Sequence, residues 1–365
     1  MPRGIGRLVQ LQTLPFFVAS NIWNFGNLNL LTNLNLYGEL NISRLENIEY
    51  ATIAKSAGLA MKKNLESLGL YWGIIPEINK DSFANLPNAR PQELTVKSCP
   101  NLAHIPLPQS LQHLELRDCN PMMMSVADLS LLSVLILEKI PDLVSLPDGL
   151  FASASLSSLK ILSCPKLHSM PLHMQNLSSL KSLTIHWCEE LSSLPQSLQN
   201  LKALESLEIS NCHSLTSLPD CGIAGLGSLQ TLSIENCSNL TSLSSSLEQL
   251  TLLEHLTIKY CPKLGSFPAG VQHLYSLRNL IVLGCPWFDS LPEGLQNVKT
   301  LQNLEIRSCS NLTALPEWFG ALDCLRSLTI YECPELEERC RRGSGEDWLK
   351  IAHVPHKDIG SPQVR

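Results

Sequence analysis

A cysteine recurs at nearly constant spacing through much of the chain, and this period restricts the possible folds more than any other feature. From Cys164 to Cys333 the successive intervals are 24, 24, 25, 24, 24, 24 and 24 residues, and Ile140 takes the place of a cysteine 24 residues before Cys164. The cysteines in this phase are Cys99, Cys119, Cys164, Cys188, Cys212, Cys237, Cys261, Cys285, Cys309 and Cys333. Such a fixed period predicts one structural unit that is stacked many times.

Each cysteine closes the same pattern, L-x-x-L-x-I-x-x-C-x-x-L-x-x-L-P. One copy comprises Leu204, Leu207, Ile209, Cys212, Leu215, Leu218 and Pro219. The L-x-I step has a period of two, which places both side chains on one face of a short strand. A single strand cannot bury that face, but stacked copies form a parallel sheet over a continuous apolar interior. We number the pattern from its first leucine, so that the cysteine is position 9.

This pattern is the leucine-rich repeat with cysteine at its Asn/Cys position. It predicts an α/β solenoid, a leucine-rich repeat horseshoe with a parallel β-sheet on the concave face and mostly irregular or short helical convex segments. Proline cannot continue a central strand because it lacks an amide donor. The Cys-Pro and Leu-Pro steps therefore mark the two bends of each repeat.

The regularity of the pattern divides the chain into three parts. Residues 1–90 are irregular repeats, with a helix inserted near 48–63 that is rich in alanine and lacks proline. Residues 91–336 are regular repeats of 20–25 residues. Residues 337–365 form a charged C-terminal cap or tail, as the last repeat needs a polar outer face. No comparable cap precedes Ile5 and Leu8, so we expect further residues upstream, as in a truncated gene product.

The cysteine column has a structural interpretation. Buried cysteine behaves as a small hydrophobic residue, whereas a zinc site needs Cys and His side chains that converge on one point. These thiols instead form a line along the solenoid. His186 and Cys188 face opposite sides of their strand, so they do not form a catalytic pair. We predict no catalytic residue, no metal and no cofactor.

The charge balance and the hydropathy pattern exclude other classes. The chain has 27 basic and 33 acidic residues, a net charge of −6, which argues against nucleic-acid binding. No segment reaches the ~18 apolar residues of a membrane span. The N-terminus lacks an uninterrupted signal-peptide core, and 13 cysteines without a disulfide scaffold fit reduced thiols. These features predict a cytoplasmic protein.

Outward positions 5, 7 and 8 of the repeats are chemically mixed and include apolar and aromatic side chains. Such side chains on an exposed face are candidates for a partner-binding surface. The alternative is that they pack on adjacent side chains of the same sheet. The candidates on the concave face are Leu162, His186, Trp187, Lys259, Tyr260, Ile281, Leu283, Arg307 and Tyr331.

Four stretches carry a resemblance to a known family. They are the opening Met1-Pro-Arg-Gly-Ile-Gly-Arg-Leu8 with Leu11-Gln-Thr-Leu14, Gly38-Glu-Leu-Asn-Ile-Ser-Arg-Leu-Glu-Asn-Ile48, Leu65-Glu-Ser-Leu-Gly-Leu-Tyr-Trp72, and Cys340 with Gly345-Glu-Asp-Trp-Leu-Lys-Ile-Ala-His-Val-Pro355. In this order they resemble the C-terminal leucine-rich repeat region of plant intracellular disease-resistance proteins of the coiled-coil NB-LRR (NB-ARC) type.

The resemblance implies a recognition module in plant innate immunity whose partner is a protein. That partner is a pathogen effector, a guarded host protein, or a nucleotide-binding switch domain acting in cis or in trans. The family's switch domain carries G-x-x-x-x-G-K-[ST], which this chain lacks, so nucleotide binding is not implied here.

Two other binding classes remain open from the sequence. The first is an F-box-type leucine-rich repeat adaptor of a ubiquitin ligase, whose repeats also use cysteine at the strand exit, although no F-box segment precedes the array. The second is a secreted receptor ectodomain, which requires a signal peptide and glycans. An enzyme is disfavoured because the ten histidines are scattered and form no spaced motif.

Overall fold

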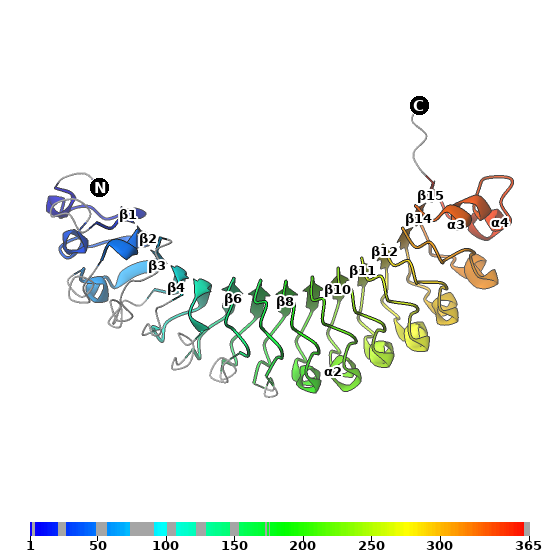
Figure 1. Cartoon of the computed structure of the whole chain (residues 1–365), viewed down its shortest axis with the longest axis horizontal. Helices are drawn as coiled ribbons and strands as arrows, with labels where there is room; N and C mark the ends of the chain where they lie inside the picture. The colour runs from blue at the N-terminus through cyan, green and yellow to red at the C-terminus, as the bar shows by residue number, and fades with distance from the viewer. Residues whose placement is uncertain are drawn as a thin grey trace, which may run out of the picture. The chain divides into compact units, whose positions relative to one another are not determined.

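The computed structural model describes residues 1, 4–20, 27–48, 57–73, 91–100, 107–121, 129–146, 153–171, 174 and 176–360. The chain divides into two compact units, Met1–Pro165 and Lys166–Arg365. In each unit short strands pair in parallel with their neighbours in chain order, and the described helices contain only three to six residues (Figure 1). The predicted leucine-rich repeat solenoid is therefore confirmed.

The first unit contains strands of unequal length. They are β1 (Phe16–Val18), β2 (Tyr37–Ser43), β3 (Asn64–Tyr71), β4 (Glu93–Cys99), β5 (His113–Cys119), β6 (Val134–Glu138) and β7 (Ser158–Leu162). Its described helices are single 3₁₀ turns, η1 (Ile5–Arg7), η2 (Leu28–Leu31), η3 (Leu45–Asn47) and η4 (Leu59–Met61). Much of the helix predicted near 48–63 lies outside the described residues. The described part of that segment contains only η4 and the residues beside it.

The second unit is more regular. Its strands are β8 (Ser182–His186), β9 (Ser206–Ser210), β10 (Thr231–Glu235), β11 (His255–Lys259), β12 (Asn279–Leu283), β13 (Asn303–Arg307), β14 (Ser327–Tyr331) and β15 (His356–Ile359). Its helices are η7 (Gln196–Asn200), α2 (Asp220–Ala224), η8 (Ser245–Gln249), η9 (Ala269–His273), η10 (Glu293–Asn297), η11 (Glu317–Ala321), α3 (Pro334–Arg339) and α4 (Trp348–Ile351). Within this unit the strands line the inner side of the arc and the short helices its outer side (Figure 1).

The strand β9 illustrates how one repeat builds its share of the core. Leu207 and Ile209 point inward and are at most 1% exposed, whereas Glu208 between them points outward and is half-buried. Leu207 pairs in register with Leu183 of β8 and Leu232 of β10. Stacking thus places leucine on leucine from one strand to the next, which makes the interior continuous.

The chain leaves each strand through a left-handed residue. Position 8 has a positive φ in every repeat from Ser98 (60°) to Glu332 (55°). Strands β6–β14 end just before this residue, whereas β4 and β5 include it and end at Cys99 and Cys119. In every repeat the next side chain, position 9, enters the interior. On the return path a proline precedes η7, η9, η10, η11 and α2, at the helix N-cap in an extended conformation.

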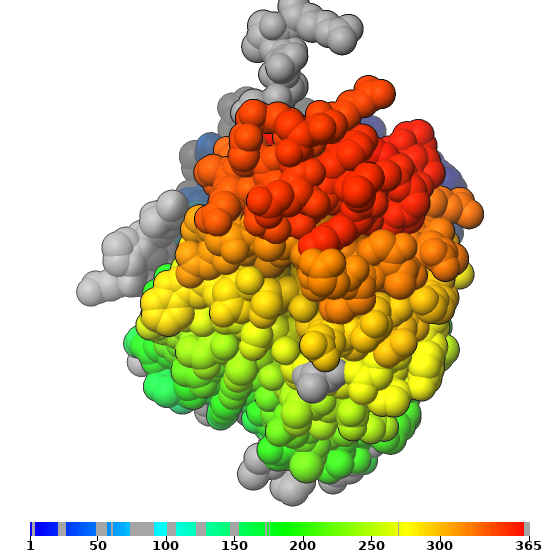
Figure 2. All heavy atoms as spheres, turned by 90° about the vertical axis from the view of Figure 1, so that its right-hand side faces the viewer, coloured from blue at the N-terminus to red at the C-terminus, as the bar shows by residue number. Residues whose placement is uncertain are grey.

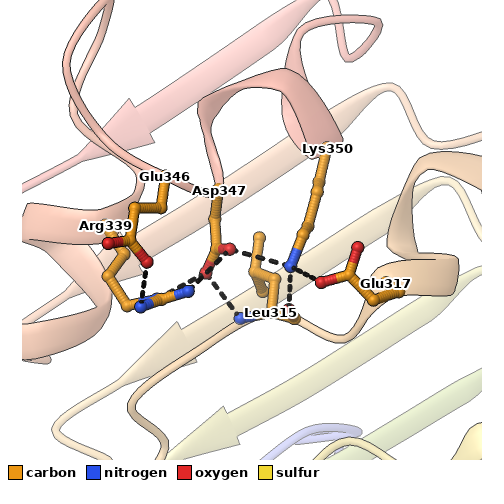
Figure 3. A network of polar contacts seen from close by, with 6 residues as sticks. All are labelled: Leu315, Glu317, Arg339, Glu346, Asp347 and Lys350. Carbon is orange, nitrogen blue, oxygen red and sulfur yellow. Dashed lines mark hydrogen bonds and ion pairs between the residues drawn. The ribbon is translucent and has the colours of Figure 1, made fainter.

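A buried carboxylate ties the C-terminal segment to the repeat that contains β13 and η11 (Figure 3). The Asp347 side chain is fully buried and accepts hydrogen bonds from the Leu315 N–H at 2.9 Å and from Nε and Nη2 of Arg339 at 3.0 and 3.2 Å. Lys350 Nζ lies 2.8 Å from Asp347, pairs with Glu317 at 2.9 Å and donates to the Leu315 carbonyl at 2.7 Å. Figure 2 shows this segment, in red, at the end of the stacked repeats.

Candidate functional site

The strands β11–β14 present three parallel columns of outward side chains. Position 3 contributes His255, Asn279, Asn303 and Ser327; position 5 contributes Thr257, Ile281, Glu305 and Thr329; position 7 contributes Lys259, Leu283, Arg307 and Tyr331. In each column the residues pair in register between neighbouring strands. Five of the nine residues predicted from the sequence therefore lie together here: Lys259, Ile281, Leu283, Arg307 and Tyr331.

The charged residues of the position 7 column have partners. Lys259 Nζ lies 3.0 Å from Glu235 of β10. Arg307 lies beside Glu305 of its own strand, with Nε and Oε1 2.5 Å apart, and its guanidinium is 6.0 Å from the centroid of the Tyr331 ring. The side chains of Lys259, Arg307 and Tyr331 are all half-buried. The column is thus an ordered ridge in which the positive charges are largely compensated.

The position 3 column forms a hydrogen-bonded ladder that the sequence analysis did not single out. Asn303 donates to the Asn279 side-chain oxygen at 2.6 Å, and Asn279 donates to His255 Nδ1 at 2.8 Å. An amide nitrogen only donates, so Nδ1 accepts and the neutral ring carries its proton on Nε2. The two asparagines are 24 residues apart, and this spacing was the available sequence signal.

A hollow of about 450 Å³ lies between the position 3 and position 5 columns on the outward face of β11–β14. Position 3 side chains form one wall, and Thr257, Ile281, Glu305 and Thr329 form most of the remainder, with Leu280 and Leu304 of the core. Its volume falls in the range of ligand-binding clefts, ~300–1,000 Å³. The surface therefore has a concave site, with mostly neutral polar groups and three aliphatic side chains.

Four predicted residues lie elsewhere. Leu162 ends β7 in the first unit and pairs with Glu138 of β6. His186 ends β8, three strands before β11 in the order of the sheet. Trp187 and Tyr260 lie one residue beyond β8 and β11, in the left-handed turn at the edge of the sheet, where they are 51% and 53% exposed. The period had predicted their exposure but not this backbone conformation.

Tyr260 lies against the backbone of the next repeat. The corresponding residue there is Gly284, with a φ of 65°, and a β-carbon added to it would lie 2.5 Å from the Tyr260 ring. Glycine thus serves both the left-handed turn and the close approach of the ring.

We expect Gly284→Ala to lower the free energy of unfolding by about 1–3 kcal/mol, since it adds left-handed strain and a clash with the ring. Ser308→Ala, at the equivalent position of the next repeat with a φ of 51°, is the matched control and should cost less than Gly284→Ala. Adding Tyr260→Ala to Gly284→Ala should recover part of the loss. Denaturant titration of the three single variants and of the Gly284→Ala, Tyr260→Ala double variant measures this coupling. Equal effects of the Gly284 and Ser308 changes would contradict it.

All ten cysteines of the column are buried. Their thiols lie near strand-end carbonyls: Cys261 donates to the Lys259 carbonyl at 3.4 Å and Cys309 to the Arg307 carbonyl at 3.3 Å. Burial raises the pKa of Cys285 to about 11, so its thiol stays protonated at neutral pH. Cysteine at position 9 therefore fills the interior and also supplies a hydrogen-bond donor, which Ile140 cannot do.

The described ranges contain no group of three His, Cys, Asp or Glu side chains arranged to hold a metal ion. None of the helices seen there has the length and apolar character needed to cross a membrane.

Comparison with solved structures defines the class of protein. The leucine-rich repeat domain of the type III effector XCV3220 (XopL) superimposes with a TM-score of 0.53 and 26% sequence identity, over 62% of this chain and 76% of that one. The chain is therefore a leucine-rich repeat protein. No family model matches it.

Sequence relatives then connect the chain to plant defence. Disease resistance protein RGA2 of Solanum bulbocastanum is 43% identical over 67 residues, and RGA1 of the same plant is 40% identical over 81 residues, which are 18% and 22% of this chain. The chain matches less than a tenth of either relative, 7% and 8% of their lengths. The resemblance to the leucine-rich repeats of plant disease-resistance proteins is confirmed.

Proposed function

We propose that this chain is a protein-recognition module of plant innate immunity that senses a pathogen effector or a guarded host protein. In this proposal it works in the cytoplasm, has no catalytic role, and regulates a nucleotide-binding switch domain that acts in cis or in trans. The observation that carries the proposal is the ordered surface of β11–β14, where compensated charges and exposed polar groups surround a hollow. The relatives named for disease resistance support the setting in defence.

The physical argument rests on the division of labour within each repeat. Inward positions are occupied by leucine, isoleucine or valine because they form the shared core, whereas outward positions carry Thr, Ile, Glu, Lys, Leu, Arg, Tyr, His, Asn and Ser. Outward side chains can therefore vary without loss of the core. A recognition surface for changing partners benefits from this independence, because affinity depends on a few well-placed aromatic and charged residues.

We expect the triple change Trp187→Ala, Tyr260→Ala and Tyr331→Ala to weaken partner binding by about tenfold or more, since single interface hot spots contribute over ~1 kcal/mol. The partner is first selected from a panel of purified effector proteins and isolated switch domains, and its Kd is then measured by calorimetry. Tyr275→Ala with Trp287→Ala is the matched control, since these aromatic side chains are 60% and 62% exposed but do not occupy the outward positions 5, 7 or 8.

Two results decide between the possibilities. Loss of affinity in the triple variant alone, with an unchanged circular dichroism spectrum, supports recognition through this face. Equal affinity of the wild type, the triple variant and the control for every partner that binds would contradict it. Catalytic activity of the wild-type chain in the absence of any protein partner would also count against a recognition module.

A further inference from the structure

The hollow on β11–β14 is a trough between the position 3 and position 5 columns. Its lining comes from these two columns and from Leu280 and Leu304 of the core, and it reaches from His255 and Thr257 on β11 to Ser327 and Thr329 on β14. The trough therefore runs across the strands, along the direction in which repeats stack. From β11 to β14 it spans three strand spacings of ~4.8 Å, or about 14 Å.

One wall of the trough has hydrogen-bonding capacity left over. Each asparagine amide has two N–H donors, and the ladder uses one from Asn279 and one from Asn303. His255 keeps its Nε2–H as a further donor, and the Asn303 carboxamide oxygen is a further acceptor. His255 and Asn303 are both exposed. This wall thus offers three N–H donors and one carboxamide acceptor.

The charges around the trough do not select a strongly charged ligand. Lys259 is paired with Glu235, and Glu305, which lines the hollow, is paired with Arg307. The remaining lining groups are amides, hydroxyls, the His255 imidazole and the aliphatic side chains of Leu280, Ile281 and Leu304. A nucleic acid or a polyanion would require uncompensated basic residues here. A neutral ligand with many hydrogen-bonding groups fits this chemistry better.

An extended polypeptide segment has these properties. At ~3.3 Å per residue, about four or five residues span 14 Å, and their peptide groups present donors and acceptors along the whole length. A helix over the same span would contain about nine residues, and its backbone groups would already be bonded internally. Only the extended form leaves peptide groups available for the ladder.

We propose that the trough of β11–β14 binds an extended, uncharged segment of about four to five residues from the protein partner, held through its backbone by Asn279 and Asn303. An aliphatic side chain of the segment packs on Ile281. This inference rests on the proposed function and deepens it, because it states the conformation and chemistry that the partner presents to the site.

The test uses the full chain and a displayed library of random linear nonapeptides as the probe. We expect selected peptides to be rich in small and aliphatic residues, and their affinity to fall at least tenfold for the double variant Asn279→Ala, Asn303→Ala. Ser182→Ala with Ser206→Ala is the matched control, because these residues occupy position 3 on β8 and β9, outside the trough. Circular dichroism verifies that both variants fold.

A second measurement tests backbone recognition directly. N-methylation of one peptide bond at a time in a selected peptide should reduce its affinity at least tenfold at the position whose N–H donates to Asn303. Selected peptides that bind the wild type and the asparagine variant equally, or that tolerate N-methylation throughout, would overturn the proposal. A library that yields no peptide dependent on the trough would also overturn it. If a folded partner still requires Trp187, Tyr260 and Tyr331 for binding, the proposed function stands although the trough proposal fails.

Discussion

Replacing Asp347 with alanine is expected to destabilise the C-terminal end of the second unit by about 3–5 kcal/mol, the usual effect of breaking a buried ion pair. The carboxylate is fully buried and joins three separate groups: the Leu315 amide, the Arg339 guanidinium and the Lys350 ammonium (Figure 3). Its removal leaves a buried N–H without its acceptor and two cations with less compensation. Hydrogen exchange of the Leu315 amide and chemical denaturation measure the change.

The neighbouring residue provides the matched control. Glu346 also pairs with Arg339, but its side chain is 75% exposed. Exposed ion pairs contribute only about 0–1 kcal/mol, so Glu346→Ala should change stability little. Similar losses in the two variants would show that Asp347 is one charge among several and not the residue that fixes this segment. A loss confined to residues after Leu315 would fit the local stability of repeat proteins.

The same carboxylate makes the stability of this segment depend on pH. Burial alone would raise the pKa of Asp347, but hydrogen bonds from Arg339, Lys350 and the Leu315 amide outweigh it and hold the pKa below its ordinary value. The stabilisation is therefore complete above the pKa of an unfolded aspartate, ~3.9, and is lost as the pH falls through the lower folded pKa. The difference in the free energy of unfolding between the wild type and Asp347→Asn should therefore become smaller as the pH falls through this acidic range.

The period of the sequence was sufficient to predict the repeated part of the fold. Leu207, Ile209 and Cys212 recur because each repeat must contribute the same inward side chains to a shared interior, and the structure buries all three. The prediction works best where a residue's environment is created by its own neighbours in the repeat and by identical residues in the next one. Strands β8–β14 satisfy this condition.

Features that depend on single contacts could not be predicted in this way. The left-handed turn at position 8 accommodates Trp187 and Tyr260 as well as Gly284, so residue type gives little indication of it. In the first repeat, Leu8 keeps the three-residue step yet is 56% exposed. Asp347 lies in a charged stretch that resembles a solvated loop, and its amide partner is 32 residues away.

The candidate site shows the same division between periodic and individual information. Ile281, Leu283 and Arg307 were found because they occupy outward positions of the repeat. The ladder of His255, Asn279 and Asn303 was missed because position 3 had not been considered, and because its bonds join side chains of neighbouring repeats. A search for polar residues recurring at 24-residue spacing would have found the two asparagines. It would not have found the hollow, whose lining combines positions 3, 4 and 5 of neighbouring repeats.

Replacing Leu207 with alanine is expected to cost about 2–5 kcal/mol, because the cavity left in a packed core adds to the lost burial. The side chain is fully buried between Leu183 and Leu232, so neither neighbouring repeat can fill the space without leaving its own position. Glu208→Ala is the matched control: it lies next in the chain on the outward face and should change stability by less than about 0.5 kcal/mol.

The location of the loss is as informative as its size. Repeat proteins transmit stability mainly between nearest neighbours, so hydrogen exchange should accelerate most in β8, β9 and β10 and less in β13 and β14. Long repeat arrays also lose two-state behaviour, and residue-level exchange avoids assuming it. Equal losses for Leu207→Ala and Glu208→Ala, or uniform acceleration throughout the unit, would contradict a core built from one leucine per repeat. The expected gradient would instead demonstrate that outward positions can change without cost to the interior, which a variable recognition surface requires.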